Sequence, residues 1–153
     1  MKLYLVRHGQ ALAENQDFLQ QLTEKGKLDV QKTAEFLKKA KIKIDRIISS
    51  RIARAVQTAE ILASVLFPTG KVEQINGISP NDSAEAFLQR IEFNEQDIML
   101  VGHLPFLSYL TSLLLSREEN TVKILYPTCS VVCLEQKDRE AWKLEFVINP
   151  ELL

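Results

Sequence analysis

The sequence has very few cysteines, which excludes two classes of structural site. Cys129 and Cys133 are the only ones. On a single strand they would lie roughly 13 Å apart at about 3.3 Å per residue, too far for a disulfide bond. Two sulfurs without a nearby histidine also make a poor metal site. We therefore expect two buried thiols in a reducing cytoplasm and no bound metal.

An excess of charge of one sign is also missing, as is a long uninterrupted hydrophobic run. The formal net charge is −1 at pH 7, so no overall positive field would hold nucleic acid or an acidic membrane. The most apolar stretch covers residues 98–115. Gly102, His103 and Pro105 interrupt it, which favours a strand, a turn and a helix over a membrane span. Residues 1–6 form too short an apolar run for a secretory signal, so we expect a cytoplasmic protein.

The 153 residues are enough for one compact domain and too few for two, so residues 1–153 are predicted to form a single domain. Along the chain, short apolar runs typical of strands alternate with stretches whose apolar residues have helical spacing. They predict strands at 2–6, 44–49, 72–75, 97–101, 130–134 and 142–147. Capping signals and helical spacing predict helices at 24–40, 51–66, 83–93 and 105–115, with Leu28, Ala34 and Leu37 facing inward on the first. This alternation predicts an α/β fold, a three-layer α/β/α sandwich with a mainly parallel central sheet.

Charged and polar groups gather at the predicted strand ends, where open parallel sheets bind their ligands. Three strand ends carry them: Arg7-His8-Gly9, Ser50 with Arg54 shortly after it, and Gly102-His103. The two histidines are the only ones in the chain. Arginine matches a phosphoryl group with paired donors, so the convergence predicts a phosphate-binding pocket.

His8 has the surroundings that a nucleophile toward phosphorus requires. A neutral imidazole attacks phosphorus, and water then hydrolyses the phosphohistidine that results. Arg7 and Arg54 would disfavour the protonated imidazolium and neutralise the oxygens of the transferring group. Gly9 leaves room beside His8 for a phosphate or for a neighbouring backbone. These residues therefore predict a phosphatase with a covalent phospho-His8 intermediate.

Four segments, taken together, resemble the sequence blocks of the histidine phosphatase superfamily, which includes the phosphoglycerate mutases. They occur in the family's order between residue 3 and about residue 110. They are Arg7-His8-Gly9 after a strand, Leu22-Thr23 with Gly26 as a turn, Ser50 to Ala59 with Arg54-Ala55-Val56-Gln57-Thr58, and Val101-Gly102-His103. The resemblance implies a phosphoglycerate mutase-like fold.

Within that family the chain looks most like the SixA-type phosphohistidine phosphatases. The short length and His103-Leu104-Pro105, followed by Tyr109-Leu110, carry this likeness. It implies that His8 is the nucleophile and that Arg7, Arg54 and His103 bind phosphate, with His103 also handling protons. It further implies no cofactor, and phosphohistidine on a phosphorelay or phosphotransfer protein as the substrate.

The chain departs from the family pattern at several positions. Gln10 stands where many relatives have Glu, and Arg51 where a Pro is common. No clear carboxylate occupies the region 74–85, where larger relatives place a general acid. An imidazole leaving group needs less help from an acid than an alkoxide does, which favours phosphohistidine as the substrate. The carboxylates within that region or next to it, none of them a clear general acid, are Glu73, Asp82 and Glu85.

Three further residues are weaker candidates for the site. Asp17 is expected at the edge of the site by resemblance. Ser50 is expected to cap the helix that follows it, and secondly to contact phosphate. Arg51 is interpreted as a surface charge.

Two alternatives of different kinds stay open. The first is a phosphatase of small phosphorylated metabolites, which rates on sugar phosphates and on phosphohistidine protein would separate. The second is a noncatalytic module that binds phosphorylated partners. Binding alone requires no nucleophile, so the retention of both histidines and both arginines argues against it.

Overall fold

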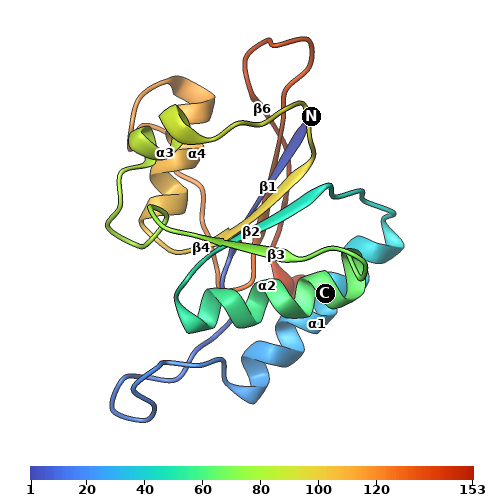
Figure 1. The fold of residues 1–153 in the computed structure, drawn as a ribbon, viewed down its shortest axis with the longest axis vertical. Coiled ribbons are helices and arrows are strands. Elements are labelled where there is room, and N and C mark those ends of the chain that lie inside the picture. Colours follow the sequence, from blue (N-terminus) through green and yellow to red (C-terminus); the bar gives the residue numbers. More distant parts are fainter.

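The computed structural model describes residues 1–153 and contains one six-stranded sheet with helices on both sides (Figure 1). The strands are β1 (Lys2–Arg7), β2 (Arg46–Ser50), β3 (Val72–Ile75), β4 (Ile98–Gly102), β5 (Val131–Glu135) and β6 (Lys143–Ile148). The helices are α1 (Glu24–Lys39), α2 (Ala53–Leu66), α3 (Ala84–Arg90), α4 (Phe106–Ser116) and the short 3-10 helix η1 (Pro150–Leu152). The strand order across the sheet is β3-β2-β4-β1-β5-β6.

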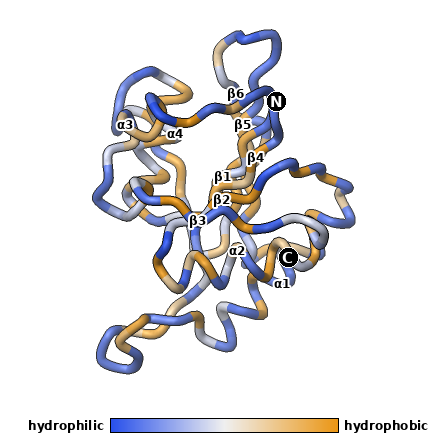
Figure 2. Tube along the Cα trace, viewed as in Figure 1, coloured by the Kyte–Doolittle hydropathy of each residue, from blue (hydrophilic) through white to orange (hydrophobic).

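The predicted three-layer α/β/α arrangement is confirmed. Strands β1 to β4 run parallel, and β5 and β6 add an antiparallel pair at one edge. Helices α1 and α2 cover one face of the sheet, and α3 and α4 the other (Figure 1). Figure 2 shows the apolar residues concentrated in the central strands and the polar ones in the peripheral loops.

The central strands are buried on both faces, which explains their nearly continuous apolar runs. In β1, Tyr4 and Val6 enter the core beneath α1 and α2, while Leu3 and Leu5 enter the core beneath α3 and α4. Burying each of these side chains contributes about 1.5–3 kcal/mol. Two separate cores therefore fix β1 and, with it, the residues that follow its last position.

The register of the parallel strands aligns the ends that carry the predicted site. Arg7 of β1 lies opposite Gly102 of β4, and Ser49 of β2 lies opposite Val101 of β4. The His8 backbone N–H donates to the Gly102 carbonyl at 3.1 Å. The three strand ends consequently lie side by side, as the sequence predicted.

The apolar stretch at 98–115 divides into β4, a turn and α4, as predicted. No helix in the structure combines the length and the apolar character needed to span a bilayer. The two cysteines are buried and free, with Cys129 preceding β5 and Cys133 inside it.

The start of α1 is locked against the chain just after His8. The Thr23 side chain caps the helix by accepting from the Gly26 N–H at 2.9 Å. A Cβ on Gly26 would lie 2.1 Å from the Gln10 carbonyl oxygen, so only glycine allows this approach. The Leu22-Thr23-x-x-Gly26 block, which the sequence suggested to be a turn, is thus the entry to a helix.

This contact generates a stability prediction. Ala normally stabilises a helix interior relative to Gly by about 1 kcal/mol. For Gly26→Ala we expect the opposite sign, a loss of about 1–3 kcal/mol in the free energy of unfolding, because the new methyl group overlaps Gln10. Urea denaturation measures it. Lys32→Ala, at an exposed position of the same helix, is the control and should change stability by less than about 0.5 kcal/mol. A Gly26→Ala protein more stable than wild type would contradict the packing described.

Candidate active site

His8 is held in one tautomer by its two hydrogen bonds. Its Nδ1 lies 2.7 Å from the Gly9 carbonyl oxygen, which can only accept, so the Nδ1 of His8 carries the proton. The Arg54 Nε–H donates to the Nε2 of His8 at 3.2 Å, so Nε2 is the unprotonated nitrogen. The nucleophilic lone pair of His8 therefore faces a guanidinium group.

Burial keeps the His8 ring neutral. Burial, together with the smaller effect of the positive charges of Arg54 and Arg7, lowers the pKa of His8 to about 4, against the opposing effect of the Gly9 carbonyl. The sequence pointed to the two arginines as the cause, but loss of solvent around the ring is the larger effect. His8 is consequently a free base at neutral pH.

Arg7 and Arg54 approach the site from opposite faces of the sheet. The Arg7 Nη1 donates to the Tyr126 carbonyl at 2.7 Å, and the Arg54 Nη1 donates to the Gln20 side-chain oxygen at 3.0 Å. Neither arginine takes part in any of the protein's six ion pairs. Burial lowers the pKa of both guanidinium groups, yet they stay charged at neutral pH. Two half-buried cations without a carboxylate partner indicate an anion-binding site.

His103 lies directly beside His8. Its side chain is 1% exposed, and the two ring centroids are 5.1 Å apart. Burial, with smaller contributions from the positive charges of Arg54 and Arg7 and from His8 in its protonated form, lowers the pKa of His103 to about 3. The structure therefore brings together all four of the strongest candidates, Arg7, His8, Arg54 and His103.

Ser50 has a different partner from the one expected. Helix α2 begins at Ala53, and its N-cap, Ile52, makes no side-chain cap. The Ser50 Oγ instead lies 2.6 Å from the Nε2 of His103, with only a longer contact of 3.3 Å from the Ile52 N–H. A hydrogen bond to a buried imidazole is favoured over helix capping here. Ser50 thus belongs to the site through His103.

Two buried nitrogens of the cluster have no hydrogen-bond partner within the protein. They are the Nε of Arg7 and the Nδ1 of His103, two of the four such side-chain atoms in the chain. Each unpaired buried polar group costs about 1–3 kcal/mol. An anion with several oxygens bound among these residues could satisfy both.

Gly9 and Asp17 organise the surroundings of the cluster. A Cβ on Gly9 would lie 2.9 Å from Val30, so Gly9 is required for the close packing of α1. The Asp17 carboxylate accepts from the backbone N–H groups of Leu19 at 3.4 Å and Gln21 at 2.8 Å. It makes no contact with the four clustered side chains, so its geometry indicates a role in shaping its own loop.

No carboxylate enters the hydrogen-bond network of the cluster. Glu73 forms a two-pronged ion pair with Arg46 at 2.9 and 2.8 Å. Asp82 accepts from the Ser79 N–H at 2.7 Å, and Glu85 lies in the first turn of α3. Glu73 and Asp82 are therefore engaged elsewhere, and no hydrogen bond joins Glu85 to the cluster.

Three residues that sequence reasoning did not single out support the site. Thr58 accepts from the Gly9 N–H at 3.0 Å and donates to the Arg54 carbonyl at 2.7 Å, which joins the nucleophile loop to α2. The sequence feature that could have identified Thr58 is its place in the block from Arg54 to Thr58. Gln20 and Tyr126, which hold the two arginines, have no such feature.

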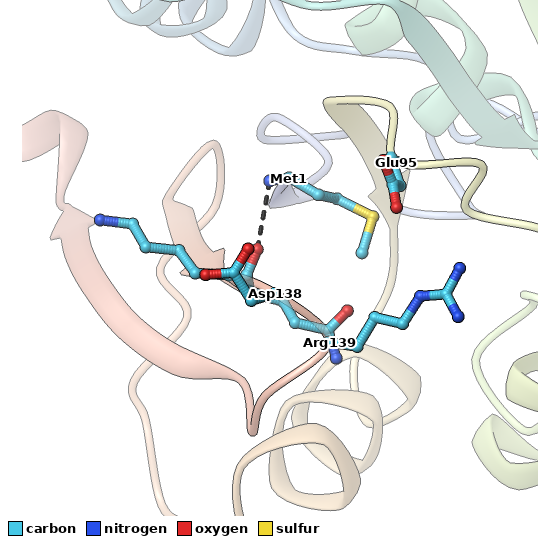
Figure 3. A pocket seen from close by; sticks show the side chains of 6 residues that line it. Met1, Glu95, Asp138 and Arg139 are labelled. Atoms are coloured by element: carbon cyan, nitrogen blue, oxygen red, sulfur yellow. Dashed lines mark hydrogen bonds between the residues drawn. The ribbon is translucent and has the colours of Figure 1, made fainter.

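A hollow of about 390 Å³ lies at the opposite end of the sheet from the His8 cluster (Figure 3). Its lining contains neither histidine nor cysteine: Met1, Glu95, Gln136, Lys137, Asp138 and Arg139. Nowhere in the structure do three His, Cys, Asp or Glu side chains gather as metal ligands would. The cluster around His8, by contrast, combines a neutral imidazole with two cations.

Comparison with known proteins agrees with this geometry. An uncharacterised protein of Picosynechococcus sp. (strain PCC 7002) is 38% identical over 114 residues, covering 69% of this chain and 67% of that protein. The phosphohistidine phosphatase SixA of Escherichia coli K12 is 30% identical over 118 residues, 73% of each chain. The solved structure of the protein histidine phosphatase SixA complexed with tungstate matches with a TM-score of 0.86 at 23% identity over 99% of both chains, a likeness of fold.

The family assignment rests on the segment that contains His8. The family model of the histidine phosphatase superfamily (branch 1) matches residues 3–79, which include Arg7, His8 and Arg54. His103, beyond that segment, completes the cluster in space. The chain belongs to the histidine phosphatase superfamily.

Proposed function

We propose that this protein removes the phosphoryl group from phosphohistidine on a protein, through a covalent phosphohistidine at its own His8. The observation that carries the proposal is the neutral His8 ring, whose Nε2 lone pair faces Arg54. The absence of a carboxylate from the network favours a leaving group that needs no strong acid. The name of the Escherichia coli relative supports the same substrate.

The first transfer needs no acid from the protein. The Nε2 of His8 gives up its hydrogen bond from the Arg54 Nε–H and attacks phosphorus, and the bond between phosphorus and the substrate's ring nitrogen breaks. The electron pair of that bond returns to the substrate ring. Because phosphohistidine carries a proton on its other ring nitrogen when it reacts, the ring leaves as neutral imidazole.

In the hydrolysis of the intermediate, His8 changes from the attacking group to the leaving group. Water attacks the phosphorus, the bond to the Nε2 of His8 breaks, and its electron pair returns to that nitrogen. Phosphate leaves as the dihydrogen ion with both protons of the water. The Gly9 carbonyl keeps the Nδ1 of His8 protonated throughout, and this makes the ring a good leaving group.

The remaining side chains stabilise the transferring group. Arg7 and Arg54 supply paired donors to its oxygens. When the Ser50 hydroxyl donates to the Nε2 of His103, the proton of His103 stands on Nδ1, the buried nitrogen without a partner. Ser50 then fixes His103 as a hydrogen-bond donor to phosphate. No metal takes part in this proposal.

The central experiment replaces the nucleophile. We expect His8→Ala to lower kcat/KM for phosphohistidine at least about a thousandfold, since no other group forms the intermediate. The circular dichroism spectrum should stay unchanged. In wild type, quenching with alkali during turnover should trap an acid-labile phosphoryl group that His8→Ala lacks.

Other outcomes of this experiment would favour the alternatives. Faster turnover of sugar phosphates than of phosphohistidine would support a metabolite phosphatase. A protein that binds phosphohistidine without turnover or label would be a binding module.

A second experiment compares two arginines three positions apart. Arg54→Lys removes the paired donors but keeps the charge, and we expect kcat/KM for phosphohistidine to fall about 10²- to 10³-fold. Arg51 is exposed and makes no side-chain hydrogen bond or ion pair, so Arg51→Lys should leave the rate within about twofold. Equal losses in both variants would mean that the arginine pattern is not specific to position 54.

The pH dependence follows from the low pKa values of the histidines. With pKa values of about 4 for His8 and about 3 for His103, both rings should keep neutral ¹⁵N chemical shifts from pH 8 down to about pH 5. Folding stability should fall as the pH drops below about 6.5, because the unfolded histidines take up protons that the folded ones do not. NMR resolves the two rings directly. A titration midpoint near 6.5 for His8 would contradict its described burial.

A further inference from the structure

A nonpolar groove lies beside the phosphate-binding cluster. It has a volume of about 390 Å³ and runs between the start of α4 and the segment that leads toward β5. Its nonpolar lining residues are Pro105, Tyr109, Val122, Ile124 and Leu125, and the remainder of the lining is polar: Ser108, Asn120 and Lys123. The chemistry proposed above uses none of them.

Both walls of this groove begin at residues that hold the cluster. On one wall, Pro105 follows His103 by two positions. On the other wall, Leu125 directly precedes Tyr126, whose carbonyl accepts from Arg7. A substrate whose phosphoryl group lies among Arg7, His8 and His103 therefore has the groove next to it.

Leu125 is almost fully exposed to solvent, although other nonpolar side chains lie next to it. Its side chain is 86% exposed, at the edge of a groove that already offers nonpolar neighbours. A single exposed leucine means little, but an exposed leucine that extends a nonpolar groove adjoining a catalytic cluster is typical of a surface that is covered when a partner binds.

We propose that this groove receives a nonpolar side chain of the phosphorylated protein, from a residue close in sequence to its phosphohistidine. The inference rests on the proposed function and names the feature of the partner that the site recognises. At about 3.3 Å per residue, a side chain two to four positions away from the phosphohistidine reaches beyond the phosphate cluster. The cations select the phosphoryl group, and the groove selects the sequence around it.

Two synthetic peptides with phosphohistidine at the centre test the groove. One has leucine at the three positions on either side of the phosphohistidine, and the other has glycine there. We expect wild type to favour the leucine peptide in kcat/KM by about fivefold or more. In Leu125→Asp this preference should drop below about twofold, while the rate on the glycine peptide stays within about twofold of wild type.

Leu152→Asp is the matched control. Leu152 lies in η1 and is 84% exposed, nearly the same as Leu125, so the change of side chain and charge is equivalent. Its preference for leucine should equal that of wild type. An equal loss in both variants would trace the effect to charge rather than to the groove.

The remaining outcomes separate the groove from the proposed function. Equal wild-type rates on the two peptides would overturn the groove and leave the phosphohistidine phosphatase standing. A Leu125→Asp protein that is slow on both peptides alike would also overturn it, because the residue would then act on the cluster itself. Failure of wild type to hydrolyse either peptide, with turnover of sugar phosphates, would reject the proposed substrate and the groove together.

Discussion

The parallel pairing of β1 with β4 brings the two histidines of the site together. With Arg7 opposite Gly102, the next residues of both strands emerge together, and the rings of His8 and His103 come within 5.1 Å. Side chains alternate between the faces of a strand, so Arg7 turns toward the layer of α4, where it meets Tyr126, while His8 turns toward α2. A slip of one residue would exchange these directions and separate the cluster.

The cluster collects positive and potentially positive groups, and neutral oxygens hold them in place. The carbonyl of Tyr126 and the side-chain amide of Gln20 orient the two arginines without cancelling their charge. A carboxylate in either position would form a strong ion pair and compete with phosphate for the same donors. Burial pushes both histidines to their neutral forms, so the positive charge of the site comes from arginine alone.

The sequence predicted the elements and the cluster well because both depend on short-range signals. Continuous apolar runs mark the doubly covered strands, and residues at the ends of parallel strands meet without further information. Contacts between segments that are far apart in the chain could not be predicted from the sequence. Ser50 was expected to cap the helix that follows it. Its actual partner, His103, is 53 positions away, so nothing in the local sequence indicated that hydrogen bond. Tyr126 contributes a carbonyl that any residue would supply. Leu28, expected to face inward with Ala34 and Leu37, is 64% exposed because the buried stripe of α1 passes beside it.

The buried nitrogens of Arg7 and His103 that lack a protein partner do not distinguish the anion that arrives from the anion that departs. In the proposed reaction, inorganic phosphate is released at the end of each cycle and offers its oxygens to the same donors as the phosphoryl group of the substrate. The groups that speed attack on phosphorus therefore also slow the escape of the product. Under the proposed function, free phosphate is therefore expected to inhibit competitively, and the affinity of this site to limit its own turnover.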